Sequence, residues 1–316
     1  MIKVERIVKR YGATTAVNNV SFQVNKGEIV GFLGPNGAGK STTLKIVTCY
    51  VVADSGKVVV DGLDVLENST EVRRRIGYLP ETTPIYPDMQ VGEYLRFVAR
   101  ARQLSGSVVG EAIDRVVDLV GIERMMKKIV AYLSKGYKQR VGLAQALIHD
   151  PSIIILDEPT SGLDPHQIIE MRELIRELGK KRLLVLSSHI LQEISAICTR
   201  ILIIKNGRIV ANGTPQELQG LVEKRQVFQA ALKGDEREIM DAVRGLDGVE
   251  QVHVVAQGDG FSTYEVAGPR GDDLGAAIYR LARQKDWELA SLSPQQESLE
   301  SVYLQLTASG PVKAAS

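Results

Sequence analysis

The chain has 316 residues, of which 39 are lysine or arginine and 38 are aspartate or glutamate, so its net charge is +1. At ~150 residues per domain this length predicts about two domains, and the balanced charge argues against a protein whose main task is to wrap nucleic acid. No apolar run reaches the ~18 residues of a membrane-spanning helix, the N-terminus lacks a secretory signal pattern, and Cys49 and Cys198 lack metal-site spacing, so we expect a cytoplasmic protein with reduced thiols.

The first two thirds of the chain alternate short β-branched runs with longer amphipathic segments. This pattern predicts an α/β domain, residues 1–215, with a largely parallel sheet. The expected strands are residues 28–33, 153–156, 183–187 and 201–204. The expected helices are residues 42–47, 94–103, 109–120, 138–149 and 166–178. The helices between residues 84 and 150 predict a mostly helical insertion in the sheet domain.

The character of the sequence changes after residue 215. A polar, helix-prone segment, residues 216–226, predicts a linker to a C-terminal accessory domain, residues 227–316. The expected order in that domain is strand 227–233, helix 236–246, strands 249–256 and 262–267, helix 274–285 and strand 288–291. This βαββαβ order predicts a small ferredoxin-like α+β domain. A short helix, residues 298–306, and a disordered tail from residue 308 are expected to follow.

A glycine-rich segment lies between the first expected strand and helix of the sheet domain. Residues 34–41 read GPNGAGKS and fit the phosphate-loop pattern GxxxxGK[ST]. The glycines allow backbone N–H groups to surround an anion, and the helix N-terminus adds its positive dipole end. Lys40 is expected to reach the β and γ phosphates, and Ser41 to ligate Mg²⁺. The predicted nucleotide-binding residues are Gly34, Pro35, Asn36, Gly37, Ala38, Gly39, Lys40, Ser41 and Thr42.

Two carboxylates follow the apolar run of residues 153–156. Asp157 is suited to hold Mg²⁺, directly or through water, and Glu158 is placed to polarise an attacking water as a catalytic base. Two acids at a strand end are also compatible with a solvated edge. The phosphate loop upstream favours the functional interpretation.

Further motifs resemble those of the ABC transporter ATPases. Residues 133–140 read LSKGYKQR, which resembles the LSGGQ signature, and residues 161–164, SGLD, resemble the D-loop. His189 resembles the family's switch histidine, and Tyr11 matches the aromatic residue that stacks on adenine. With the phosphate loop and the acidic strand these make six elements in the family's order over about residues 1–215.

The resemblance implies a P-loop ABC ATPase fold and a mechanism that one chain cannot complete. In the family, two ATPase domains meet head to tail, and the signature of one closes over the ATP held by the other. Ser134, Gly136 and Asp164 would then contact nucleotide across the interface, with His189 as a second catalytic residue. ATP and Mg²⁺ are the implied ligands, and a second copy or a paralogue is the implied partner.

Two departures from the family pattern carry information. Glu81 occupies the Q-loop position, where the family usually has glutamine; its carboxylate can still ligate Mg²⁺. Lys135 replaces the first signature glycine and Tyr137 the usual glutamine. With residues 139–147, QRVGLAQAL, these departures resemble the exporter ATPases that include the bacterial gliding-motility-associated ATP-binding protein and the copper-processing ATPase of nitrous oxide reductase maturation. Such ATPases pair with separate membrane subunits of the ABC-2 type.

Basic and apolar patches suggest where a membrane partner would bind. Residues 73–75 and 180–182 are basic clusters, which fit either a solvated helix end or contact with anionic lipid or a membrane subunit. By the family resemblance, a cytoplasmic helix of the membrane subunit docks near residues 84–94. Ile85, Tyr86 and Met89 would anchor it if they are exposed, although packing against the protein's own core is equally compatible.

These observations predict an ATP-hydrolysing subunit that powers export through separate transmembrane permease subunits. It would be peripheral on the inner face of the cell membrane, with no nucleic acid partner. The alternative is a soluble ABC ATPase acting on ribosomes or nucleic acid, which would usually carry two cassettes or a long coiled-coil insertion. A third possibility, a module with a dead ATPase, is disfavoured because Lys40, Asp157, Glu158 and His189 are all present.

Overall fold

The computed structural model divides the chain into two compact units, Met1–Pro215 and Gln216–Ser316. It describes residues 1–220, 225–258, 260–269, 273–295 and 299–308, and each unit is treated by itself. Most of the expected tail, and the first residue of the expected terminal helix, lie outside the described residues. Within them, no helix is long and apolar enough to cross a bilayer.

The first unit is built around a six-stranded sheet of order β10-β9-β3-β8-β7-β6. Its strands are β3 (Ile29–Leu33), β6 (Ile76–Leu79), β7 (Ile153–Asp157), β8 (Leu183–Ser188), β9 (Arg200–Lys205) and β10 (Arg208–Gly213). All neighbours are parallel except β9 and β10. Every residue of β3, β6, β7 and β8 is buried, as expected for parallel strands covered on both faces.

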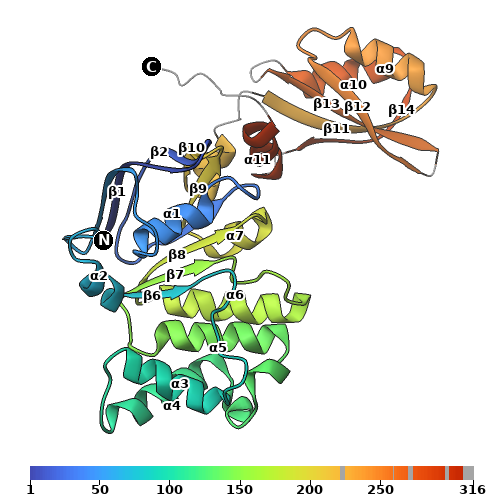
Figure 1. The fold of residues 1–316 in the computed structure, drawn as a ribbon. Helices are drawn as coiled ribbons and strands as arrows, with labels where there is room; N and C mark the ends of the chain where they lie inside the picture. The colour runs from blue at the N-terminus through green and yellow to red at the C-terminus, as the bar shows by residue number, and fades with distance from the viewer. Residues whose placement is uncertain (221–224, 259, 270–272, 296–298, 309–316) are drawn as a thin grey trace. The chain divides into compact units, whose positions relative to one another are not determined.

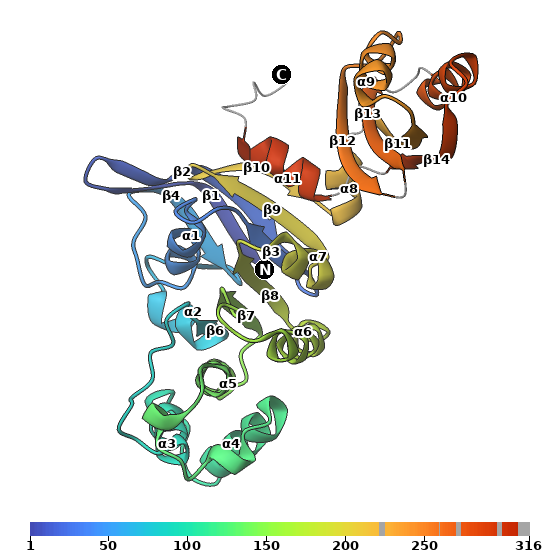
Figure 2. The same cartoon turned by 90° about the vertical axis from the view of Figure 1, so that its right-hand side faces the viewer.

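Helices cover both faces of this sheet. α1 (Lys40–Val47) lies on one side of the parallel strands, and α6 (Pro165–Gly179) and α7 (Leu191–Ile197) lie on the other (Figure 2). A second, antiparallel sheet of order β2-β1-β4-β5 lies on the side of α1; its strands are β1 (Ile2–Tyr11), β2 (Thr14–Val24), β4 (Ser55–Val60) and β5 (Leu63–Asp64). One hydrophobic core joins the two sheets.

The expected helical insertion is present. α3 (Val91–Ala101), α4 (Val108–Val120) and α5 (Lys135–Leu147) lie together at one end of the unit, and α2 (Ser69–Arg75) precedes β6 (Figure 1). α3 and α5 begin three residues earlier than the sequence predicts, because caps extend them. The side chains of Gln90 and Glu93 form a capping box on α3, and the Ser134 hydroxyl accepts the N–H of Tyr137 at 3.4 Å.

The second unit contains the expected βαββαβ order. Its elements are β11 (Arg225–Lys233), α9 (Glu236–Arg244), β12 (Gln251–Gly258), β13 (Phe261–Pro269), α10 (Leu274–Gln284), β14 (Glu288–Gln295) and α11 (Leu299–Ala308). The sheet has the order β12-β13-β11-β14 and is antiparallel throughout, which is the split βαβ arrangement. It has its own hydrophobic core. Where the sequence predicts a linker, α8 (Pro215–Gly220) occupies the first residues.

Both cysteines are free thiols. Cys198 is 6% exposed and its Sγ lies 2.8 Å from the position that a Cβ on Gly31 would take, whereas Cys49 is half-buried. Burial raises the pKa of both thiols. The sequence predicts a buried, unrelated pair of thiols; both are free and Cys198 is buried, but Cys49 is only half-buried.

Candidate functional site

The carboxyl ends of β3 and β7 border a cavity of about 510 Å³, a volume within the ~300–1,000 Å³ typical of small-molecule sites. It brings together most of the residues that the sequence singles out. The lining residues are Tyr11, Ala16, Asn36, Gly37, Ala38, Gly39, Lys40, Ser41, Thr42, Glu81, Glu158, Ser161 and His189.

The backbone of the phosphate loop requires glycine at two positions. Gly39 has a φ of 104°, and a Cβ there would lie 2.4 Å from the carbonyl oxygen of Ala16; a Cβ on Gly34 would lie 2.3 Å from that of Ile204. α1 begins at Lys40, immediately after the loop. Its unpaired N-terminal N–H groups and dipole therefore face the cavity, an arrangement that attracts anions.

The Lys40 ammonium lies at the centre of the site. It donates to the carbonyl oxygens of Gly34 at 2.8 Å and Pro35 at 3.3 Å, and it lies 3.4 Å from Oε1 of Glu158. Both charged side chains are less than a tenth exposed. Gly34 and Pro35 thus contact Lys40 without lining the cavity.

Asp157, the last residue of β7, is held by two hydroxyl groups. Ser41 Oγ donates to its Oδ1 at 3.0 Å, and Ser187 Oγ donates to the same oxygen at 2.6 Å. Burial raises the pKa of Asp157, with smaller upward contributions from the Glu81 and Glu158 carboxylates. A buried carboxylate among other acids, beside a hydroxyl, is the environment that a hard divalent cation stabilises. These residues therefore fit Mg²⁺.

Glu158 is fixed through both its backbone and its side chain. Its φ is 50°, in the left-handed region, and its N–H donates to Ser187 Oγ at 3.0 Å. His189 Nδ1 lies 2.9 Å from Oε2 of the carboxylate. The carboxylate is thus placed at the cavity wall between an ammonium and an imidazole, where it can accept a proton from a water molecule.

Ser134, Gly136 and Asp164 do not line this cavity. Ser134 is the N-cap of α5, and Asp164 is the N-cap of α6, where it accepts the N–H of Gln167 at 2.9 Å. A Cβ on Gly136 would lie 2.4 Å from Oε1 of Gln167. The signature and the D-loop of one chain therefore form a single local surface.

The two departures from the family pattern occupy different places. Glu81 is exposed and lines the cavity, as its expected metal role requires. Lys135 lies outside the cavity, and its Nζ is 2.0 Å from the position of a Cβ on Gly162, so the ammonium lies against the D-loop backbone.

The segment after Glu81 is attached to the signature helix. Thr83 Oγ1 donates to Gln139 Oε1 at 3.0 Å, and the Tyr94 hydroxyl donates to the Pro84 carbonyl at 3.0 Å. Tyr86 is 55% exposed and packs edge-on against Tyr94 and Phe97, at ring distances of 6.1 and 5.5 Å. Ile85 and Met89, for which the sequence leaves exposure and packing against the core equally open, are half-buried.

Sequence reasoning missed Ser187 and Ala16 in this site, and it gave Ser161 only as part of the D-loop motif. Ser187 holds both carboxylate residues, through Asp157 Oδ1 and the N–H of Glu158. The available signal was a pair of serines that end an otherwise apolar strand next to His189. Ala16 gave no signal, because it reaches the site from β2 through its backbone.

Comparisons with known proteins agree with this geometry. A family model described as "ABC transporter" matches residues 17–161. The bacitracin transport ATP-binding protein of Bacillus licheniformis is 32% identical over 99% of both chains. The linearmycin resistance ATP-binding protein of Bacillus subtilis (strain 168) is 30% identical over 97% of this chain and 98% of that protein.

Solved structures show the same fold. The ATP-binding subunit of an ABC transporter superposes with a TM-score of 0.64 at 32% identity, covering 70% of this chain and 92% of that one. A dimeric ATP-binding cassette in a post-hydrolysis state, bound to ADP and Pi, gives a TM-score of 0.62 at 26% identity over 68% of this chain and 98% of that one. The predicted fold class and family are confirmed. The chain belongs to the ABC transporter family as an ATP-binding protein, and it is an ABC-type ATPase.

Proposed function

We propose that this chain is the ATP-hydrolysing subunit of an ABC-2 type exporter that acts through separate transmembrane permease subunits. The observation that carries the proposal is the cavity in which the phosphate loop, Glu158 and His189 meet. The transport role is supported by relatives named for bacitracin transport and linearmycin resistance, which align over nearly the full length of the chain.

In this proposal the nucleotide-binding and charged residues in and behind the cavity wall have defined tasks. Tyr11 stacks on the adenine, and the loop N–H groups and Lys40 hold the β and γ phosphates. Glu158 accepts a proton from the water that attacks the γ phosphorus while the bond to the bridging oxygen breaks, and His189 keeps the carboxylate oriented. Ser41, Asp157 and Glu81 would hold Mg²⁺, which when bound neutralises charge that develops on the phosphates.

We propose further that two chains complete the site as an ATP sandwich. Ser134, Gly136 and Asp164 lie outside the cavity of their own chain, so in this arrangement they contact the nucleotide of a second copy or a paralogue. Helix α5 would direct its N-terminus, capped by Ser134, at the γ phosphate of the partner site. The dimeric state of similar ATP-binding cassettes supports this arrangement.

Mixing two inactive variants tests the sandwich of identical chains. Lys40→Ala removes the ammonium that binds the β and γ phosphates, and Ser134→Ala removes the hydroxyl of the signature. Each variant alone is therefore expected to hydrolyse ATP poorly. A mixed dimer contains one site with an intact loop and an intact signature. ATP turnover of the mixture should therefore exceed that of either variant alone. A mixture no more active than the separate variants would contradict pairing between identical chains.

The membrane role predicts peripheral association with the inner face of the cell membrane and no nucleic acid partner. Affinity purification of the chain from detergent-solubilised membranes should recover permease subunits. Recovery from membranes should persist in Glu158→Gln, which changes chemistry and not the surface. Exclusive recovery with ribosomes would replace the proposal by the alternative of a soluble ABC ATPase.

The second unit is assigned an accessory role. We propose residues 1–215 as the ATPase domain, residues 216–226 as the connection and residues 227–316 as a domain that supports or regulates dimerisation. Its separate hydrophobic core favours an independent role. Residues 221–316 carry 10 basic and 15 acidic residues, a net charge of −5, which leaves +6 for residues 1–220.

A further inference from the structure

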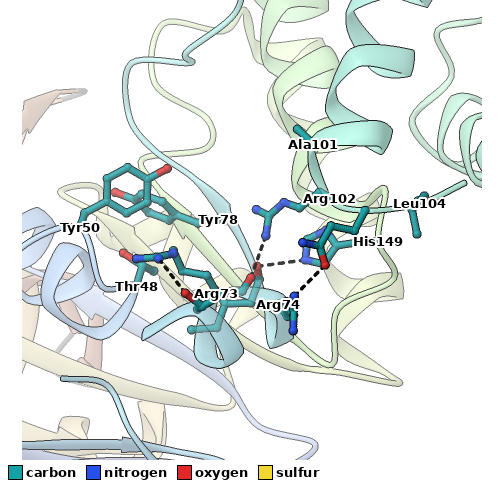
Figure 3. Close-up of a pocket in the computed structure, with 12 residues that line it drawn as sticks. Thr48, Tyr50, Arg73, Arg74, Tyr78, Ala101, Arg102, Leu104 and His149 are labelled. Carbon is teal, nitrogen blue, oxygen red and sulfur yellow. Dashed lines mark hydrogen bonds between the residues drawn. The ribbon is translucent and has the colours of Figure 1, made fainter. Parts of the chain in front are cut away.

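A second cavity in the first unit, of about 570 Å³, shares no lining residue with the ATP cavity. We call it the arginine cavity. It lies among the C-terminal end of α1, helix α2, the start of β6 and the end of α3, with one residue from beyond α5 (Figure 3). The lining residues are Thr48, Tyr50, Thr70, Arg73, Arg74, Ile76, Tyr78, Ala101, Arg102, Gln103, Leu104 and His149.

The lining contains three arginines and no carboxylate. Arg74 is neutralised, because it pairs with Glu71 outside the lining and also donates to Gln103 Oε1 at 2.7 Å. In the part of the chain that the structure describes, Arg73 and Arg102 have no ion pair. Arg102 donates to the backbone carbonyl of Arg73 at 2.7 Å, and Arg73 donates to Thr70 Oγ1 at 3.4 Å. Two guanidinium groups therefore share one cavity without a counter-charge.

Arg102 is the partly buried member of this pair, whereas Arg73 is exposed to water. Burial lowers the pKa of Arg102, and the nearby positive charge of Arg73 lowers it further. Charged groups that are removed from water are stable when they are paired and hydrogen-bonded. An oxyanion between Arg73 and Arg102 would supply both the charge and the acceptors.

Two of the lining residues carry buried polar atoms without partners. Among the described residues, the Tyr78 hydroxyl has no hydrogen-bond partner although Tyr78 is only 6% exposed, and Nδ1 of His149 has none either. His149 Nε2 lies 3.2 Å from the Ile76 carbonyl, and burial lowers the pKa of the imidazole to about 4, so at neutral pH Nδ1 is an acceptor. Buried polar atoms in folded proteins almost always have a partner. These two point to a ligand that also carries a hydroxyl or a comparable polar group.

The geometry favours a phosphate over a carboxylate. Arg73 lies in α2 and Arg102 directly follows α3. Figure 3 places Arg102 and His149 on one side of the cavity and the Tyr50 and Tyr78 rings on the other. A carboxylate presents two oxygens in one plane, which match a single guanidinium fork. The oxygens of a phosphate point in several directions and can accept from both arginines at once.

We propose that the arginine cavity binds a phosphate group, supplied either by a free phosphorylated molecule or by an anionic phospholipid headgroup. Tyr50, which is 63% exposed and 5.2 Å from Tyr78, provides an aromatic edge for the rest of the ligand. The site does not depend on the transport role, because it shares no residue with the ATP cavity.

Equilibrium dialysis of the full chain against radiolabelled inorganic phosphate tests the proposal by stoichiometry. The wild type should bind two equivalents, one at the phosphate loop and one in the arginine cavity. Lys40→Ala should lose the first, and Arg73→Gln with Arg102→Gln should weaken the second at least about tenfold. If the double variant fails to fold, Arg73→Gln alone serves as the test, because the Arg73 side chain is exposed. It should also weaken binding of the second phosphate. Lys180→Gln with Lys181→Gln removes two positive charges from another surface and should retain both equivalents.

Vesicles distinguish the two sources of phosphate. If phosphatidylglycerol vesicles sediment the wild type but not the arginine variant, and phosphatidylcholine vesicles sediment neither, the ligand is a headgroup; phosphate binding without vesicle binding identifies a free molecule. A single phosphate equivalent in the wild type, or two in the arginine variant, overturns the proposal. A third result also overturns the proposal: no second phosphate equivalent binds to the wild type, and the arginine variant no longer co-purifies with permease subunits. The cavity would then be a binding site for a protein segment.

Discussion

Glu158 adopts a left-handed backbone conformation, with a φ of 50°, at the point where the chain leaves β7. Residues other than glycine are uncommon in this region, and those that occur there are concentrated at functional sites. The N–H of Glu158 is bonded to a buried serine, and its carboxylate contacts both Lys40 and His189. The position of the carboxylate is thus fixed by the backbone and by three neighbours.

Glu158→Gln keeps the size of this side chain and removes its ability to take a proton. We expect ATP to bind and to promote dimerisation, while hydrolysis falls at least about 100-fold, the range of a lost general base. Single-turnover release of phosphate and ATP-dependent gel filtration measure the two effects. Glu177→Gln, an exposed carboxylate on α6, is the control and should hydrolyse ATP normally. Wild-type turnover in Glu158→Gln would remove Glu158 from the mechanism.

His149 predicts a pH dependence of stability. Burial and the positive charge of Arg102 lower its pKa from 6.5 to about 4. When the pH falls below the unfolded pKa, the unfolded chain takes up a proton that the folded chain excludes, so the free energy of unfolding decreases as the pH falls from about 6.5 to about 4. At pH 4.5 the loss at this site amounts to about 2–3 kcal/mol.

Urea unfolding of the wild type and His149→Gln at pH 7.5 and 4.5, in buffers without phosphate, measures this effect. Glutamine can still donate to the Ile76 carbonyl and does not titrate. The decrease in unfolding free energy between the two pH values should be smaller in the variant. Equal decreases in both proteins would mean that the pKa of His149 does not differ between the folded and unfolded states.

At the level of elements, local sequence signals predict some boundaries well. Asp164, Asp235 and Asp273 cap α6, α9 and α10, and these helices begin within one residue of the prediction. The antiparallel sheet of β1, β2, β4 and β5 was not predicted. Both of the pairs that β1 makes, with β2 and with β4, shift register, which breaks the alternation of buried and exposed residues that a sequence pattern detects.

The packing of α5 against β6 depends on a close backbone approach. A Cβ on Gly77 would lie 2.2 Å from the Ala146 carbonyl oxygen. Gly77→Ala should therefore lower the unfolding free energy by about 1–3 kcal/mol, because strand and helix must separate. Gly110→Ala in α4 is the matched control: a Cβ there meets nothing within 4 Å, and alanine should raise stability by about 0.5–1 kcal/mol. Thermal unfolding compares the two, and equal shifts would contradict this packing.

At the scale of the whole molecule, the sequence predicts the site residues that lie in one continuous segment. It misses the residues that only the fold brings to the site. The phosphate loop and the acidic strand end are each continuous segments, so their residue types and order point to their location. Ala16 lines the same cavity, and Ser187 holds Asp157 behind its wall, only because β2 and β8 lie beside the phosphate loop and β7. The residues that line the arginine cavity come from five separate segments of the chain. No local sequence pattern predicts that these segments meet.

The two units predict the outcome of a truncation after Gly220. Among the described residues, each unit has a hydrophobic core of its own, so residues 1–220 should fold and bind ATP with an affinity within about twofold of the full chain. If the second unit supports or regulates dimerisation, ATP-dependent dimer formation or turnover should change at least about threefold. Analytical ultracentrifugation and ATPase assays test this, and unchanged values in both would refute an accessory role in assembly.

The state of the two cysteines offers a practical route to observing the catalytic cycle. Cys198 is enclosed beside Gly31, and burial disfavours the thiolate form of both Cys198 and Cys49. Thiol reagents react with thiolates, so both native groups should react slowly at neutral pH. Tyr132 is exposed and lies next to the signature. A Tyr132→Cys side chain should therefore react with a thiol-reactive fluorophore much faster than the two native cysteines. Energy transfer between two chains labelled in this way would report closure and opening of the pair in real time, in an otherwise native sequence.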